Sequence, residues 1–376
     1  MADVLIYADT VRSGELRHEV PLGIADPFLY VERNGSRHLV IGSLELPRLK
    51  GLGFELHPYE EFGVEELRRS GIGRLELQDE IAVRAVRKLG VTDAVVPAGF
   101  PLLLADKLRA SGVSLRAEHE LFVERRRVKG AAELAGIRKA QAAAEAGMAA
   151  ARDLLHRAEA DGAGLAVDGA PLTSERLKAA IAQAFLERGA TCDEFIVSHG
   201  AQTAIGHEMG HGSIHAGEPV VFDLFPRDRA TGMYSDMTRT YVVGEPPAEL
   251  VEWHRLCKEA LDRVVAAAGP GVNGRDLMKI AADLFAEHGH PTQFTKRPGE
   301  VLDRGFFHSL GHGVGLEVHE RPWLGRVGDD LVEGDVIALE PGLYRPGFGG
   351  VRLEDVAVVT SDGVDVVTSY AYALQP

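Results

Sequence analysis

Two pairs of carboxylates in the C-terminal half constrain the fold of this chain more than any other feature. Asp223 ends an apolar run and Asp236 begins the next, with the turn-rich segment 226–232 between them. Glu340 and Glu354 repeat this layout around a segment rich in proline and glycine. Such spacing is typical of a strand, a turn and a return strand, which place two side chains next to each other. The chain therefore predicts two hairpins that each present an acidic pair.

A histidine lies next to the second pair in sequence. His312 occupies the glycine-rich segment 311–315, where glycine would let the backbone approach a metal or substrate closely. Four carboxylates gathered in a low-dielectric cleft repel one another unless a cation is present. A pair of hard divalent ions would convert this repulsion into binding energy. We therefore expect Asp223, Asp236, His312, Glu340 and Glu354 to converge on divalent metal.

The order of expected elements occurs twice between residue 130 and residue 359. In each half, two helices precede short strands and a hairpin, although no residue-level repeat is visible. The expected helices are 130–160, 173–188, 248–268 and 274–288, and the expected strands are 194–198, 219–225, 233–243, 305–310, 315–319, 335–344 and 350–359. This pattern predicts an α+β domain of two similar halves that face each other across a cleft.

Residues 1–124 form a second, smaller region with alternating strand and helix signals. Asn34-Gly35 between two apolar runs is a strong signal of a two-residue hairpin. Helices are expected at 64–70, 79–89 and 101–111, and strands at 94–96 and 115–122. We interpret this region as a small α/β domain with a structural or oligomeric role. The basic run 124–129 is interpreted as a solvated joint that pairs with the acidic remainder of the chain, before the domain that spans 125–376.

Composition excludes several classes of function. The 376 residues carry a net charge of −15 without an offsetting basic region, which argues against nucleic-acid binding. The N-terminus lacks the pattern of a signal peptide, and the apolar runs are too short to span a membrane. The two cysteines, Cys192 and Cys257, are expected to be buried thiols in a reducing compartment. We therefore expect a cytoplasmic protein with no membrane or nucleic-acid partner.

The segment from His207 to His211 fits the zinc-protease pattern His-Glu-x-x-His, which requires a helix to bring both imidazoles onto one face. Glycine and proline surround this segment and make a helix improbable. The extended form of the pattern also fails, because Ile214 stands where glycine is required. We therefore do not expect a single-zinc site here.

Several segments together resemble the pita-bread metallopeptidases, the superfamily of methionine aminopeptidase, aminopeptidase P and prolidase. The similarity covers residues 125 to 360. The matching segments are Gly206-His207, Ser235–Thr240, His308–Glu320, Leu339–Tyr344 and Val351–Asp355. The N-terminal region resembles, more weakly, the creatinase-type domain of prolidase and aminopeptidase P. The resemblance implies a C-terminal pita-bread fold with pseudo-two-fold halves behind a smaller α/β domain, and it implies a homodimer.

The resemblance also assigns roles to residues. It implies that Asp223 chelates one metal ion, that Asp236 and Glu354 bridge two ions, and that His312 and Glu340 complete the second site. Manganese is the expected metal, with cobalt or zinc as alternatives, and oxygen-rich ligation independently favours a hard ion such as manganese.

Further residues match the family's substrate pocket: His207, His308, His319 and Arg352. The implied catalytic roles are proton transfer by Glu340 and stabilisation of the oxyanion by His207 and His319. His211 and His215 have no assigned role.

The activity implied by this resemblance is metal-dependent hydrolysis of Xaa-Pro bonds in dipeptides or short peptides. Three alternatives stay open: an aminopeptidase P that acts on longer Xaa-Pro-Yaa peptides, a metal-free creatinase-like C–N hydrolase, and a non-catalytic binding module. One departure from the family concerns Asp223, which is followed by Leu224 and Phe225 rather than by x-Gly. The loop to Asp236 is longer than usual, and we expect one of Arg227, Asp228 and Arg229 to overhang the cleft.

Overall fold

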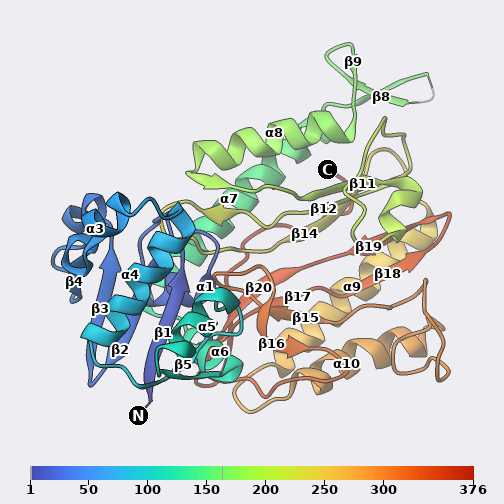
Figure 1. Ribbon diagram of the computed structural model, residues 1–376. Coiled ribbons are helices and arrows are strands. Elements are labelled where there is room, and N and C mark those ends of the chain that lie inside the picture. The colour runs from blue at the N-terminus through green and yellow to red at the C-terminus, as the bar shows by residue number, and fades with distance from the viewer. Residues whose placement is uncertain (1, 163) are drawn as a thin grey trace. The chain divides into compact units, whose positions relative to one another are not determined.

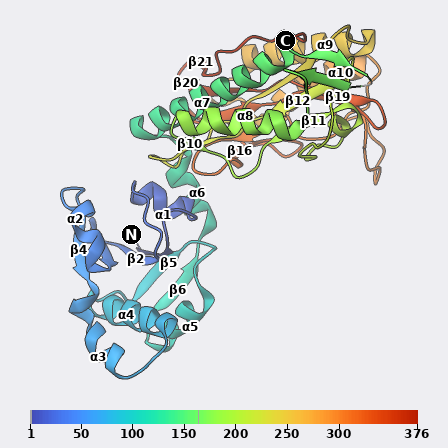
Figure 2. The same ribbon diagram turned by 90° about the horizontal axis from the view of Figure 1, so that it is seen from above.

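The computed structural model describes residues 2–162 and 164–376. Contacts divide the chain into two compact units, Met1–Arg126 and Arg127–Pro376. Figures 1 and 2 show the elements of each unit from two directions. Within the described residues, no helix is both long enough and apolar enough to cross a membrane.

The N-terminal unit is built on one mixed six-stranded sheet in the order β4-β3-β2-β1-β5-β6. Its strands are β1 (Asp3–Ala8), β2 (Phe28–Arg33), β3 (Ser36–Ile41), β4 (Glu55–Pro58), β5 (Asp93–Val96) and β6 (Ser114–Ala117). The expected hairpin is present between β2 and β3, where Arg33 pairs with Ser36. Asn34 and Gly35 both have positive φ, at 50° and 81°, as a two-residue hairpin turn requires.

Helices cover this sheet, and two hydrophobic clusters fill the space between them. The helices are α1 (Gly14–Glu19), α2 (Leu46–Leu49), α3 (Val64–Arg69), α4 (Arg74–Lys88) and α5 (Leu102–Ala110), with 3₁₀ turns η1 (Ser43–Glu45) and η2 (Tyr59–Phe62). The strand expected at 115–122 is wrong in its second half. There β6 ends at Ala117 and α6 (His119–Arg127) begins two residues later, placing Phe122 and Val123 on a helix.

The first half of the C-terminal unit packs two helices against a three-stranded sheet, as expected. Helices α7 (Ala131–His156) and α8 (Ser174–Glu187) lie side by side in both views. The antiparallel strands β11 (Ile196–His199), β12 (Pro219–Asp223) and β14 (Thr238–Val242) lie in that order. The helix α8 begins where the Thr173 hydroxyl accepts a hydrogen bond from the Arg176 amide. Smaller pieces are β7 (Glu159–Asp161), β8 (Gly164–Val167), β9 (Ala170–Pro171), β10 (Ala190–Thr191), η3 (Gly200–Ala204) and β13 (Arg227–Asp228).

The second half repeats this order with helices α9 (Ala248–Ala267) and α10 (Gly274–Glu287). Asn273 caps α10 by accepting from the Arg275 amide, much as Thr173 caps α8. A five-stranded antiparallel sheet follows in the order β16-β15-β17-β20-β21, and β18 and β19 form a separate hairpin. The five strands of the sheet are β15 (Gly311–Gly313), β16 (Glu320–Leu324), β17 (Val336–Leu339), β20 (Asp355–Thr360) and β21 (Gly363–Val366). The hairpin consists of β18 (Gly342–Arg345) and β19 (Gly349–Arg352).

Two expected strands of this half are wrong. The segments 305–310 and 315–319 lie outside the strands, which are displaced to β15 and β16. Glycine explains the difference, because positions 311 and 313 of β15 pack too tightly against the neighbouring strands for a side chain. A Cβ on Gly311 would lie 1.9 Å from the Ala338 carbonyl oxygen, and one on Gly313 would lie 2.2 Å from that of Arg321. These glycines therefore serve strand packing rather than approach to a ligand.

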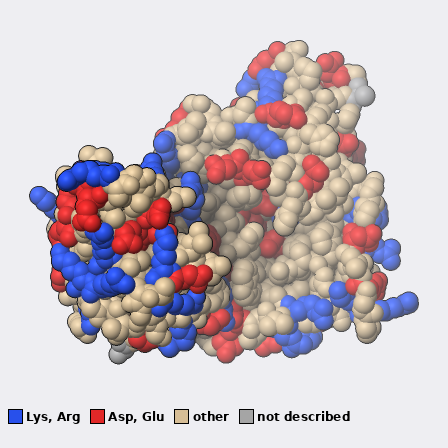
Figure 3. Space-filling view, in the orientation of Figure 1, with Lys and Arg blue, Asp and Glu red and all other residues tan. Residues whose placement is uncertain are grey.

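The basic run 124–129 is not solvated within the C-terminal unit. Arg127 donates to Asp335 with an Nε–Oδ1 distance of 2.8 Å, and both side chains are buried. The Lys129 ammonium lies 2.6 Å from Glu320 Oε1, with side chains 1% and 3% exposed. The expected pairing with acidic residues is confirmed for these two cations, but the expectation that they are solvated is wrong, because both pairs are buried. On the face drawn in Figure 3, acidic and basic side chains are otherwise interspersed.

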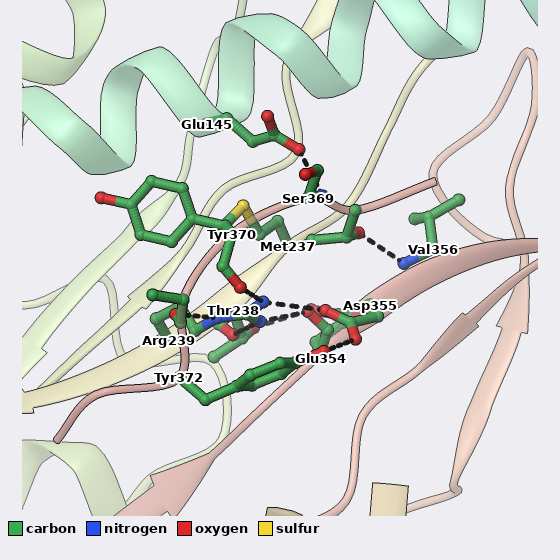
Figure 4. Close-up of polar contacts among 12 residues, drawn as sticks. Glu145, Met237, Thr238, Arg239, Glu354, Asp355, Val356, Ser369, Tyr370 and Tyr372 are labelled. Carbon is green, nitrogen blue, oxygen red and sulfur yellow. Dashed lines mark hydrogen bonds and ion pairs between the residues drawn. The ribbon is translucent and has the colours of Figure 1, made fainter. Parts of the chain in front are cut away.

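A fully buried arginine joins the two halves of the C-terminal unit. Arg239, on β14, donates to the Glu354 carbonyl at 2.8 Å and to Asp355 Oδ1 at 2.9 Å (Figure 4). The same guanidinium donates to the carbonyls of Ala371 and Tyr370. The β14 strand is thereby tied to the start of β20 and to the C-terminal segment.

Replacing this arginine should destabilise the protein strongly. In Arg239→Gln the Asp355 carboxylate keeps its burial but loses its ion-pair partner, which costs about 3–5 kcal/mol in unfolding free energy. Urea denaturation of the metal-free protein measures the loss. Arg345→Gln is the matched control, since its pair with Glu249 is exposed and should contribute about 1 kcal/mol or less. Equal losses in the two variants would contradict this account of Arg239.

Candidate metal centre

The four carboxylates predicted from sequence all lie at strand ends. Asp223 is the last residue of β12 and pairs in register with Thr238, so Asp236 lies just before the facing strand. Glu340 directly follows β17 and Glu354 directly precedes β20, next to the register pair Leu339–Asp355. The two strand pairs therefore present their acids in the same way, one from each half of the unit.

His312 lies in the middle of β15 and faces carboxylates from both halves. Its Nε2 atom is 3.8 Å from Asp236 Oδ2 and 4.0 Å from Glu340 Oε1. Ligand-type atoms of Asp236, His312 and Glu354 all lie within 4.8 Å of one another, and all three residues are buried. The His312 Nδ1 atom contacts the Gly313 carbonyl at 3.1 Å, so Nδ1 carries the proton and Nε2 offers its lone pair to the cluster.

One atom of this cluster is unsatisfied. Asp236 Oδ1 is buried without a hydrogen-bond partner among the residues that the structure describes. A buried carboxylate oxygen of this kind is costly unless a cation or donor meets it. Glu354, by contrast, accepts a hydrogen bond of 2.7 Å from the Thr238 hydroxyl. The orphaned oxygen and the facing Nε2 lone pair fit a divalent metal ion.

The electrostatics of the cluster point the same way. Burial, followed by the charge of Asp223, raises the pKa of Glu354 to about 8. Burial and the charge of Glu354 raise the pKa of both Asp236 and Glu340 well above the usual range. Burial and the nearby His319 lower the pKa of His312 to about 3. Without a cation, burial thus favours the protonated form of these three carboxyl groups and the neutral form of the imidazole, and metal binding opposes that protonation.

Arg352 supplies the positive charge nearest to Asp223. Its Nη2 atom donates to Asp223 Oδ2 at 2.5 Å, and Nη1 donates to the Tyr344 hydroxyl at 3.1 Å. That hydroxyl lies 2.9 Å from His308 Nε2, and His308 Nδ1 lies 2.7 Å from the Ser309 carbonyl. The carbonyl assigns the proton to Nδ1, so Tyr344 donates to Nε2 and accepts from Arg352. Arg352 thus donates a hydrogen bond to Tyr344, and Tyr344 donates one to His308.

The other histidines of the expected pocket are more exposed. His319 packs edge-on against His312 with ring centroids 4.3 Å apart, and burial lowers its pKa. His207 is exposed in the loop after η3. Burial lowers the pKa of His308 to about 3, with smaller contributions from Arg352 and His207. His207 also acts on His319, so it lies within electrostatic reach of both histidines.

The zinc-protease pattern at 207–211 is not helical, as expected. Gly210 has a φ of +83°, and a Cβ there would lie 1.8 Å from the Val197 carbonyl oxygen. The segment is therefore held against β11 in a conformation that only glycine adopts. His207 and His211 do not share a helical face.

In the long loop after Asp223, one of the three residues expected to overhang the cleft, Asp228, is instead buried. Arg227 and Asp228 form β13, which pairs with β10. Asp228 is buried, and its Oδ2 accepts from the Thr231 amide at 2.8 Å and from its hydroxyl at 2.6 Å. Asp228 therefore does not overhang the cleft, because its carboxylate closes this turn, and an overhang by Arg227 or Arg229 stays a prediction.

Sequence reasoning assigned no role to three residues that shape the centre. Thr238 bonds Glu354, Arg239 fixes the backbone at Glu354, and Tyr344 links Arg352 to His308. Each falls inside a segment that carried the family resemblance. A buried arginine between two threonines within an apolar strand was the available signal for Arg239 and Thr238.

The two similar halves and their shared carboxylate-rich cluster define a class, the pita-bread metallopeptidases with an α+β fold. The sequence profile of metallopeptidase family M24 matches residues 135–361, more than half of the chain. The chain therefore belongs to metallopeptidase family M24, and divalent metal binding follows from membership.

Individual relatives agree with this assignment. The probable dipeptidase PepE of Mycobacterium tuberculosis is 32% identical over 292 residues, which are 76% of this chain and 68% of the relative. The Xaa-Pro dipeptidase of Pyrococcus furiosus is 37% identical over 179 residues, so the match spans less than half of that relative, 46%. The prolidase structure of Pyrococcus horikoshii OT3 aligns over 100% of this chain and 95% of its own, with a TM-score of 0.77 and 26% identity.

The raised pKa of Glu354 generates a prediction for the metal-free protein. Between its ordinary value of 4.5 and the folded value of about 8, the native state binds more protons than the unfolded state. The free energy of unfolding should therefore fall as pH rises through this window. Urea denaturation at several pH values, with a chelator present, measures the slope.

Two comparisons test the origin of this slope. Glu354→Gln removes the titrating group and keeps an acceptor for Thr238, so its slope should be shallower. Excess divalent metal should also flatten the slope of the native sequence, because bound cations replace the protons. A slope that is the same with and without Glu354 would contradict the assignment.

Proposed function

We propose that this protein hydrolyses Xaa-Pro peptide bonds in dipeptides or short peptides. The observation that carries the proposal is the buried set of Asp236, His312 and Glu354, with its orphaned oxygen, in a chain of family M24. Relatives named as Xaa-Pro dipeptidases and a prolidase structure of the same fold support the substrate class.

We propose that five residues of this centre bind two divalent metal ions. Asp223, Asp236, His312, Glu340 and Glu354 would hold the ions. One nitrogen among carboxylate oxygens favours manganese, with cobalt or zinc as alternatives. When bound, such ions supply the positive charge that lowers the pKa of water and polarises a carbonyl.

Glu340 is the proposed proton carrier. Burial and the charge of Glu354 raise its pKa, which suits a group that accepts a proton from the attacking water and later releases it. As the C–N bond of the substrate breaks, this proton goes to the proline nitrogen, which has none of its own in the peptide. The water oxygen and its second hydrogen stay on the new carboxyl group, which then gives that proton to the released proline nitrogen, so a carboxylate and an ammonium result and atoms and charge balance.

Histidines of the pocket orient the reacting carbonyl. The lowered pKa of His319 keeps its imidazole neutral, and a neutral imidazole can donate one hydrogen bond to the developing oxyanion. His207 is proposed to act beside it. His308 and Arg352 are proposed to line the substrate site, where Tyr344 holds both in place.

The proposal also includes the setting of the enzyme. We propose that residues 1–124 are a creatinase-type domain, that residues 125–376 are the catalytic domain, and that the protein is a cytoplasmic homodimer. The larger unit is the proposed catalytic domain because Asp236, His312 and Glu354 all lie in it.

Replacing the proton carrier separates metal binding from turnover. Glu340→Gln keeps an oxygen ligand but cannot accept the proton, so kcat on Gly-Pro should fall by about 10²–10⁴-fold. Metal content, measured by elemental analysis, should stay close to that of the native protein. Glu333→Gln, at an exposed site, is the matched control and should leave kcat unchanged. An unaltered rate in Glu340→Gln would rule out this role.

Substrate length is tested by comparing Ala-Pro with Ala-Pro-Ala on manganese-loaded protein. A higher kcat/KM for the dipeptide is expected. Preference for the tripeptide would instead indicate an aminopeptidase P. Full activity after exhaustive chelation would favour the metal-free creatinase-like alternative, and no cleavage of either peptide would favour a binding module.

A further inference from the structure

A second cluster of metal-type donors lies outside the carboxylate-rich centre, at the base of the loop between β11 and β12. It consists of His199, His215 and Glu218, whose ligand-type atoms all lie within 4.8 Å of one another. His199 pairs in register with Val220, whereas Asp223 pairs with Ile196, so about 10 Å of strand separates the two clusters. Figure 1 labels both strands.

The hydrogen bonds of His199 leave its Nδ1 atom facing an acceptor. Its Nε2 atom lies 3.0 Å from the His211 carbonyl oxygen, which can only accept, so Nε2 carries the proton. In a neutral ring Nδ1 then holds a lone pair. This atom is 3.0 Å from Glu218 Oε2, another atom that only accepts when the carboxylate is charged. This contact therefore needs either a second proton on the His199 ring or a metal ion.

His215 turns its Nδ1 atom toward the same carboxylate oxygen. The distance from Nδ1 to Glu218 Oε2 is 3.3 Å, and the His215 amide also donates to that oxygen at 3.2 Å. In its Nδ1–H tautomer a neutral His215 donates to this oxygen, so one added proton, on His199, would satisfy the three side chains without a metal ion. One divalent ion would instead satisfy both lone pairs and the carboxylate together.

The spacing of these donors matches a small tetrahedral site. Zinc binds nitrogen and carboxylate oxygen at about 2.0–2.2 Å, which places neighbouring ligand atoms about 3.4 Å apart. The two nitrogen–oxygen distances of 3.0 and 3.3 Å are close to that value. The His211 carbonyl fixes the tautomer of His199, as partners of metal-bound histidines usually do.

The backbone makes room for the carboxylate. Gly200 has a φ of +53°, and a Cβ at this position would come within 2.9 Å of Glu218 Oε1. Side-chain exposure rises from 9% at His199 to 33% at Glu218 and 44% at His215, so the cluster opens toward solvent on one side. A fourth position is therefore accessible to water.

A third donor cluster, in the N-terminal unit, shows why this hydrogen-bond pattern matters. There His57 donates from Nδ1 to Glu61 and offers its Nε2 lone pair to His38 Nδ1, at 3.2 Å. His38 can supply the proton, so that cluster is satisfied by ordinary hydrogen bonds. The His199 cluster cannot be satisfied in this way while its rings are neutral.

We propose that His199, His215 and Glu218 form a second metal site, specific for a borderline ion such as Zn²⁺. Two imidazoles and one carboxylate favour such an ion over the hard ions that suit the carboxylate-rich centre. The ion would hold together the two ends of the loop 200–218, which carries His207. The site does not depend on the proposed peptidase activity.

Zinc titration of the full-length protein tests the site. Binding is measured by calorimetry and by elemental analysis after gel filtration, using Zn²⁺ alone as the probe. The native protein should retain one more equivalent than either His215→Ala or Glu218→Gln, because each variant removes one of three donors. The carboxylate-rich centre is unchanged in every variant, so it cancels in the comparison.

His211→Ala is the matched control. Its side chain lies in the same loop and is 73% exposed, while the carbonyl that bonds His199 belongs to the backbone and remains. This variant should bind as much zinc as the native protein. Equal zinc content in all four proteins would overturn the proposal and leave an imidazolium–carboxylate pair only. Circular dichroism confirms that each variant is folded before its zinc content is compared.

A second measurement guards against a loss of zinc through misfolding. Cleavage after Glu208 by a glutamate-specific endopeptidase should slow at least severalfold when Zn²⁺ is added to the native protein or to His211→Ala. The same addition should leave the rate unchanged in His215→Ala and Glu218→Gln. Equal protection by zinc in all four proteins would also overturn the proposal.

Discussion

The C-terminal unit depends on one buried interaction, the contact of Arg239 with the backbone and side chain at the start of β20. The candidate metal centre gathers its donor residues from both halves, and the halves are separate sheets with separate cores. Arg239 spans them by donating to the Glu354 carbonyl and to Asp355. Thr238 adds a bond to the Glu354 side chain from the adjacent position. The strand β14 therefore sets the position of a candidate ligand that lies in the other half.

These buried contacts allow the centre to gather acidic groups whose ionised forms oppose folding. The raised pKa values of Asp236, Glu340 and Glu354 show that burial and mutual repulsion disfavour their ionised forms. Such strain persists only where surrounding structure over-determines the geometry. Here the surrounding structure consists of paired strands, a buried arginine and the Arg352–Tyr344–His308 chain. A cation then recovers the electrostatic cost as binding free energy.

Local patterns in the sequence predicted more than long-range ones. The helices and the acidic positions at strand ends follow from short-range periodicity and turn residues, which need no knowledge of the partner strand. The strands at 305–319 were misplaced because β15 is made of glycine and histidine and has no apolar alternation. The burial of Arg127 and Lys129 was missed because their partners, Asp335 and Glu320, lie about two hundred residues away. The residue types of the centre were visible in the sequence, but the contacts of Thr238, Arg239 and Tyr344 required the fold.

The strand β12 connects two clusters of opposite electrostatic character. At its C-terminal end, carboxylates outnumber the single imidazole and leave an oxygen without a partner. At its N-terminal end, two imidazoles converge on one carboxylate oxygen. His207 lies in the exposed loop whose base contains that second cluster, so it has no strand to hold it in place. A ligand that fixed the base of the loop would therefore affect the position of His207. That ligand would lie about 10 Å along the strand from the carboxylate-rich centre.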